Sequence, residues 1–121
     1  MDRIGFEEDL PPATASDVAC YAQSVAAQLS EISRQFGLSG LAALFVAADR
    51  EAGRALKRLG PAGRPEAIKD WGEGPRDRTQ AAHLCAELAI ALVLECERVG
   101  LASVATLFYA AWQAAGQDEL A

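Results

Sequence analysis

Residues 37–52 and residues 100–115 are two copies of one sequence pattern, separated by a constant offset along the chain. The first copy reads GLSGLAALFVAADREA and the second reads GLASVATLFYAAWQAA. Apolar residues upstream keep the same offset, with these pairs: Val25 and Leu88, Leu29 and Leu92, Phe36 and Val99. A repeat of this kind, with helical spacing on both sides of a glycine, predicts two copies of a helix–turn–helix hairpin. The expected fold is therefore all-α, an antiparallel four-helix bundle built from two repeated helical hairpins.

Capping residues set the expected helix boundaries. Thr14 followed by Asp17 has the spacing of a capping box, so the first helix should begin after Thr14. Gly37 and its repeat Gly100 should each end a helix in the left-handed conformation, and Ser39 is expected to cap the second helix. The second helix should end at Gly60–Pro61. The third should begin near Asp77 or Thr79 and run to Val99, and the fourth should run from about Ser103 to Ala115.

These limits divide the chain into an extended acidic N-terminal segment (1–13), a four-helix bundle (14–115) and a disordered tail (116–121). Within the bundle, hairpin one covers 14–59, a linker covers 60–77 and hairpin two covers 78–115. Consecutive antiparallel helices need only about 2–8 connecting residues, so this linker is longer than such a geometry requires. Trp71 in the linker should be packed, either on its own bundle or against a partner or second subunit.

Composition limits the classes of partner. The formal net charge is −6, which makes nucleic acid and anionic membrane poor partners. The cysteines Cys20, Cys85 and Cys96 form no CxxC motif and lie in apolar helical patterns, so reduced thiols in a cytoplasmic protein are expected. The apolar run 84–94 contains Glu87 and is too short to span a bilayer. Arginine outnumbers lysine in an alanine- and glycine-rich chain, which favours a bacterial source.

The two copies differ where hairpin two has lost charge. Asp49, Arg50 and Glu51 of the first copy correspond to Trp112, Gln113 and Ala114 of the second. The third helix is apolar nearly all round, which indicates burial on more than one face. We therefore expect the protein to form a homodimer through hairpin two. Another protein is a further possible partner. The alternative is that the linker or the N-terminal segment covers this surface. The expected interface residues are Ile90, Leu94, Tyr109 and Trp112.

A second feature is a stripe of cations at helical spacing on the second helix, formed by Arg50, Arg54, Lys57 and Arg58. This anionic-partner patch would fit an acidic peptide, a phosphorylated ligand or the acidic N-terminus of a second subunit. The alternative is a solvated face, because cations near a helix C-terminus interact favourably with the helix dipole.

His83 is the only histidine, and a lone exposed histidine in a four-helix bundle suggests a histidine phosphotransfer domain. That family has a lysine and a small residue just after the histidine, whereas here Glu87 follows one turn later. A carboxylate there repels a phosphohistidine, so His83 is only a secondary candidate phosphoacceptor. The sequence contains no recognisable catalytic constellation, metal-ligand set or cofactor motif.

The sequence therefore favours a small non-enzymatic protein–protein interaction or regulatory module. One alternative is a phosphotransfer-like signalling protein that uses His83. Another is a small-molecule sensor with a pocket between the hairpins, since helical bundles do form such sites.

Overall fold

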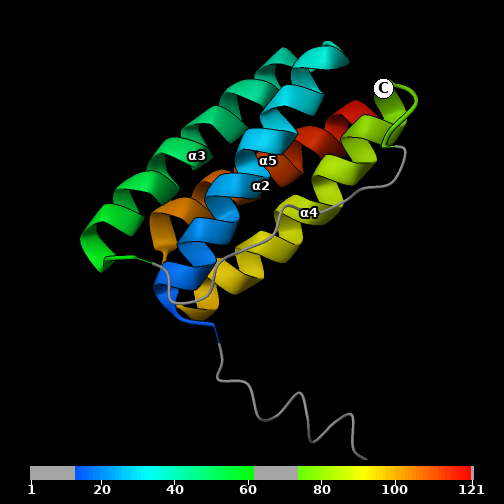
Figure 1. The fold of residues 1–121 in the computed structure, drawn as a ribbon. Coiled ribbons are helices and arrows are strands. Elements are labelled where there is room, and N and C mark those ends of the chain that lie inside the picture. Colours follow the sequence, from blue (N-terminus) through cyan, green and yellow to red (C-terminus); the bar gives the residue numbers. More distant parts are fainter. Residues whose placement is uncertain (1–12, 62–73, 121) are drawn as a thin grey trace, which may run out of the picture.

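The computed structural model describes residues 13–61 and 74–120, and every regular element in these two ranges is an α-helix. The helices pack into a bundle (Figure 1), which confirms the expected all-α fold class. Their bounds are α2 (Ala15–Gln35), α3 (Ser39–Leu59), α4 (Arg78–Arg98) and α5 (Ala102–Leu120).

The start of α2 is fixed by the capping box that the sequence predicted. The backbone N–H of Asp17 donates to Thr14 Oγ1 at 3.1 Å, and the backbone N–H of Thr14 donates to Asp17 Oδ2 at 3.0 Å. At the start of α4, Asp77 Oδ1 accepts from the backbone N–H of Gln80 at 2.8 Å. These contacts satisfy amide groups that have no partner inside the first turn of a helix.

Both hairpin turns use the same backbone solution. Gly37 and Gly100 have φ of 75° and 82°, as the repeat predicted. After each glycine, the next amide donates back to the carbonyl five residues earlier, Leu38 to Ser33 and Leu101 to Cys96, both at 2.8 Å. This is the Schellman arrangement, in which the residue after the glycine packs against the helix it has just left. Leu38 also occupies the N-cap position of α3 without a side-chain cap, so the expected cap by Ser39 is wrong.

The end of α5 differs from the expectation. We expected the last helix to stop at Ala115 and a disordered tail to follow, but α5 continues to Leu120. Ala115 is fully buried and anchors the last turns in the core. A glycine inside a helix costs only about 1 kcal/mol relative to alanine, so Gly116 does not end the helix when its neighbours are held by packing.

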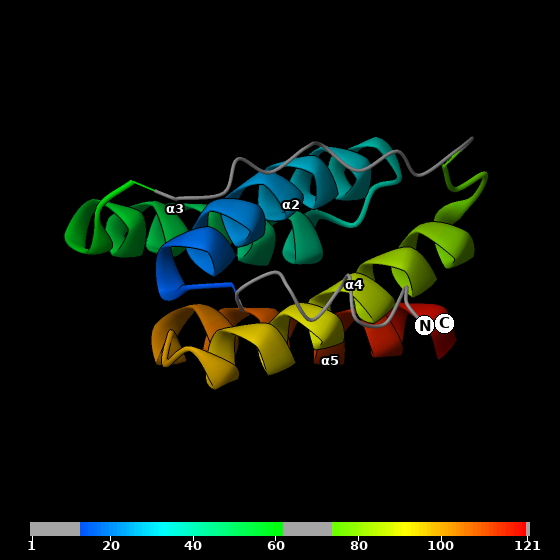
Figure 2. The same ribbon diagram turned by 60° about the horizontal axis from the view of Figure 1, so that its bottom comes forward.

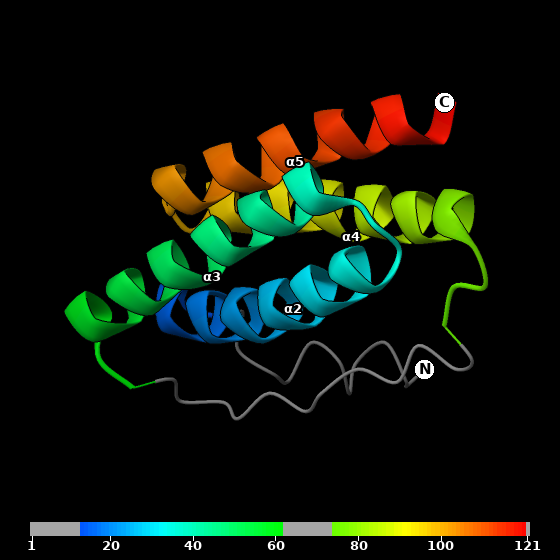
Figure 3. The same cartoon turned by 90° about the horizontal axis from the view of Figure 1, so that it is seen from above.

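The two hairpins form two layers, α2 with α3 and α4 with α5 (Figures 2 and 3). Between the layers, α2 packs on α4 and α3 packs on α5, so each helix meets its own repeat. At the centre, Phe45 and its repeat Phe108 are both fully buried, with ring centroids 6.2 Å apart. The two hairpins therefore contribute repeat-related rings to the same place in the core.

The order of the helices sets a minimum length for the linker. Arg78 at the start of α4 donates from Nη1 to the carbonyl of Gly37, at 3.4 Å, beyond the end of α2. At the other end of α4, Arg98 Nη2 donates to the carbonyl of Ala13 at 3.3 Å. Helix α4 therefore starts at the opposite end of the bundle from the end of α3, about 30 Å away at 1.5 Å per helical residue. The linker has to cover that length, which takes at least about nine extended residues, so the roughly 2–8 residues expected for antiparallel neighbours would be too few.

Candidate interaction surface

Three of the four residues expected at an interface are exposed. Leu94 is 62% exposed, Tyr109 45% and Trp112 38%. Ile90 is only partly exposed and packs against the buried core. The expectation that α4 is buried on more than one face fits its wide buried arc, which includes Ala82, Ala86 and Val93 in addition to the repeat-matched positions. Leu94 nevertheless lies outside that arc.

The aromatic residues of α5 contact each other. The rings of Tyr109 and Trp112 have centroids 5.5 Å apart and are inclined at 38°. Tyr109 also borders a groove of about 410 Å³ between the C-terminal end of α4 and the first turns of α5. Leu94 lies one turn before Glu97, which lines the same groove, so the exposed apolar surface of α4 adjoins the groove. The groove residues are Glu97, Gly100, Ala102, Ala105, Thr106 and Tyr109.

The repeat shows what occupies the equivalent surface of hairpin one. Asp49 stands where hairpin two has Trp112, and Glu31 stands where it has Leu94. Val46, which matches Tyr109, is 40% exposed. Hairpin one therefore keeps a largely polar surface on the same backbone, and the aromatic and aliphatic side chains are specific to hairpin two.

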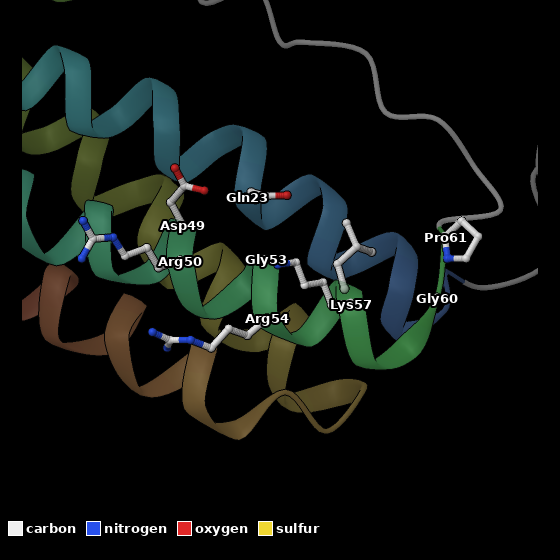
Figure 4. Close-up of a pocket in the computed structure, with 9 residues that line it drawn as sticks. Gln23, Asp49, Arg50, Gly53, Arg54, Lys57, Gly60 and Pro61 are labelled. Carbon is white, nitrogen blue, oxygen red and sulfur yellow. The ribbon is translucent and has the colours of Figure 1, made fainter.

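A larger groove lies between α2 and α3 of hairpin one, with a volume of about 710 Å³ (Figure 4). Three of the four predicted cations, Arg50, Arg54 and Lys57, line it. Arg54 Nη1 makes an ion pair with Glu51 Oε1 at 2.7 Å. Arg58 lies elsewhere, beside a hollow of about 150 Å³ next to the first turn of α5. The predicted basic stripe is therefore divided between two sites.

Sequence reasoning did not identify the other lining residues of the larger groove. Gln23 of α2 crosses toward Gly53 of α3, and a Cβ added at Gly53 would lie 2.9 Å from Gln23 Nε2. A glycine in the middle of an otherwise strong helix was the available signal, because it marks a close approach of another group. Asp49 and the chain end at Gly60–Pro61 complete the groove.

His83 lies on the exposed side of α4. Its Nε2 is 3.1 Å from Glu87 Oε2, and the two side chains are 58% and 65% exposed. The carboxylate therefore lies close enough to repel a phosphate group on the imidazole, as the spacing suggested. The assignment of His83 as a phosphoacceptor stays a prediction.

The cysteines are free thiols. Cys85 and Cys96 are buried, and Cys85 Sγ is 3.6 Å from Ser33 Oγ of the facing helix α2. Burial raises the pKa of the Cys85 thiol, although the Ser33 hydrogen bond lowers it in part. Burial, together with the negative charge of Glu95, raises the pKa of Cys96 to about 12. Both buried thiols therefore stay protonated and unreactive near neutral pH. Among the described residues, no group of three or more His, Cys, Asp or Glu side chains is placed to hold a metal ion.

Other expectations fall outside these sites. Trp71 lies outside the described residues, as do most of the linker and residues 1–12 of the N-terminal segment. Among the described helices, α4 alone is long and apolar enough to cross a membrane by length and composition. A bundle helix buried on several sides gives the same signal, and the cytoplasmic location stays a prediction.

Similarity to known proteins gives no further assignment. No protein family matches the chain, and searches of curated proteins and of solved structures also returned no match.

Proposed function

We propose that this protein is a small protein–protein interaction module that associates with a second copy of itself through α4 and α5. The observation that carries the proposal is the exposed set Leu94, Tyr109 and Trp112. Hairpin one forms the same helix–turn–helix structure with a charged residue at two of the three matching positions. The apolar side chains are therefore not required by the hairpin fold, and they are best explained by contact with another surface.

The charge distribution favours a second copy as the partner. Residues 102–117 of α5 contain no Asp, Glu, Lys or Arg, whereas the matching residues 39–54 of α3 contain four such residues. A symmetric contact places each surface against itself, so any charge near the two-fold axis meets a like charge. An uncharged helix carrying Tyr109 and Trp112 avoids that repulsion.

The available area is sufficient for a dimer. Helices α4 and α5 are each about 30 Å long, and two neighbouring helices present a face roughly 20 Å wide. One such face covers on the order of 600 Å², so a symmetric contact buries about 1,200 Å² in total, the lower end of the range for stable interfaces. We therefore expect a dimer of moderate affinity that dissociates on dilution.

The test is the molar mass in solution, measured by light scattering over a range of concentrations. We expect wild type to reach twice the chain mass of 12.8 kDa, and Leu94→Glu to remain at the chain mass. Trp112→Asp installs the residue that hairpin one has at the matching position, so it should give a folded monomer. Val46→Asp on α3 is the matched control and should leave the dimer intact.

Circular dichroism establishes that each variant keeps its helical content. A wild-type protein that stays at the chain mass at about 100 µM contradicts the proposal. So does a folded Trp112→Asp variant that dimerises as strongly as wild type.

A further inference from the structure

The groove between α2 and α3 carries positive charge that its surroundings do not neutralise. Arg50, Arg54 and Lys57 line it, against the single carboxylate Asp49. Arg54 is already paired with Glu51, whereas Arg50 and Lys57 make no ion pair with any residue in the described ranges. A basic groove in a chain of net charge −6 is suited to an acidic ligand, because such a ligand gains attraction there that the rest of the surface does not offer.

The groove is not purely ionic. The side chain of Leu56 and the backbone at Gly53 and Gly60 form its apolar part, and Pro61 lies at one end (Figure 4). From Asp49 to the end of α3 at Leu59 it follows about 15 Å of helix at 1.5 Å per residue, and Gly60 and Pro61 continue it beyond the helix end. Its ligand should therefore be an extended segment that combines carboxylates with apolar side chains.

The first residues of this chain have that composition. Residues 1–10 read MDRIGFEEDL, in which four carboxylates and one arginine accompany Ile4, Phe6 and Leu10. We infer that the groove between α2 and α3 is a docking site for acidic peptide segments and that residues 2–10 of the same chain occupy it.

The position of the chain supports this assignment. Residues 1–12 lead into Ala13 at the start of α2, and α3 ends at that same end of hairpin one, where Gly60 and Pro61 border the groove (Figure 1). Nine extended residues reach about 30 Å, enough to follow the whole groove. The groove beside Tyr109 fits the segment less well, because it is lined by Glu97 and contains no cation.

The experiment is backbone NMR on the full chain. If the segment is docked, the amides of Glu7, Glu8 and Asp9 should have order parameters above about 0.7, which should fall below about 0.6 in Lys57→Glu. Arg58→Glu is the matched control, with the same charge change one residue away and outside the groove, and it should leave these order parameters unchanged. High salt should release the segment in wild type, because exposed charge pairs are screened within a few ångströms at about 1 M.

A reciprocal variant keeps the proposal testable from the ligand side. Replacing Glu7, Glu8 and Asp9 by Gln, Gln and Asn should shift the amide signals of Gly53 and Gly60 and leave that of Gly116 unchanged. Order parameters below about 0.6 for residues 7–9 in wild type overturn the inference. So does equal sensitivity to Lys57→Glu and Arg58→Glu. Signals that change on tenfold dilution of the monomeric Trp112→Asp variant would assign the segment to another copy and overturn the intramolecular form.

Discussion

Replacing the turn glycines by alanine tests whether the two hairpins use one turn. A non-glycine residue in the left-handed region costs about 1–2 kcal/mol, and Gly37 and Gly100 have φ of 75° and 82°. A Cβ at Gly100 meets nothing within 4 Å, and one at Gly37 lies 3.5 Å from Arg78 Nη1, an ordinary contact. Backbone strain is therefore the whole cost, and each alanine should lower the free energy of unfolding by about 1–2 kcal/mol.

The double variant should lose the sum of the two single losses. The two turns lie at opposite ends of the bundle, about 30 Å apart, and distant sites contribute independently. Urea denaturation followed by circular dichroism, at one fixed protein concentration, measures these values. Asparagine at either position should recover part of the loss, because it tolerates the left-handed conformation.

Gly116→Ala is the control, since Gly116 is helical and a Cβ there also meets nothing within 4 Å. It should raise the free energy of unfolding by about 0.5–1 kcal/mol. The reasoning is refuted if alanine at both turns changes stability by less than about 0.3 kcal/mol, or if asparagine costs as much as alanine.

Three further outcomes follow from the same contacts. Gly53→Ala should raise the free energy of unfolding, measured by urea denaturation, less than Gly116→Ala does, because its Cβ displaces the Gln23 amide. Adding Gln23→Ala should remove this deficit. Thr14→Ala should lower the free energy of unfolding by about 1 kcal/mol, since it removes an N-cap. Burial raises the pKa of the Cys96 thiol from 9.0 to about 12. Above pH 9 the unfolded chain therefore loses this proton, whereas the folded chain keeps it until the pH approaches 12. Stability should therefore fall as pH rises from 9 toward 12, by up to about 1.4 kcal/mol per pH unit, and Cys96→Ala should reduce that slope in denaturation curves measured at each pH.

The parts of the fold that depend on short-range chemistry could be predicted from the sequence. Thr14 and Asp17 form a capping box through their own side chains and backbone, and Gly37 and Gly100 supply a backbone conformation that other residues resist. These signals involve neighbours in the chain, so no tertiary information is needed to interpret them. The repeat then indicates that both turns are alike.

The arrangement of the hairpins could not be obtained in the same way. The end of the bundle at which α4 starts depends on how the two hairpins pack, with Phe45 against Phe108, and the linker composition carries no signal of that contact. The groove between α2 and α3 was missed for a similar reason. Gln23 and Gly53 are far apart in the sequence, and only the packed hairpin brings them together. The end of α5 depends on burial of Ala115, which outweighs the local preference of Gly116.

The chain has to pass from one end of the molecule to the other between α3 and α4. The length of segment 60–77 therefore decides whether hairpin two can pack on hairpin one of the same chain. A connection of fewer than about nine residues cannot cover roughly 30 Å even when fully stretched. In a chain shortened that far, both hairpins can pack only if two molecules exchange their second hairpins, as in a domain-swapped dimer. Trimming this stretch should thus produce intertwined pairs whose association no longer responds to Trp112→Asp.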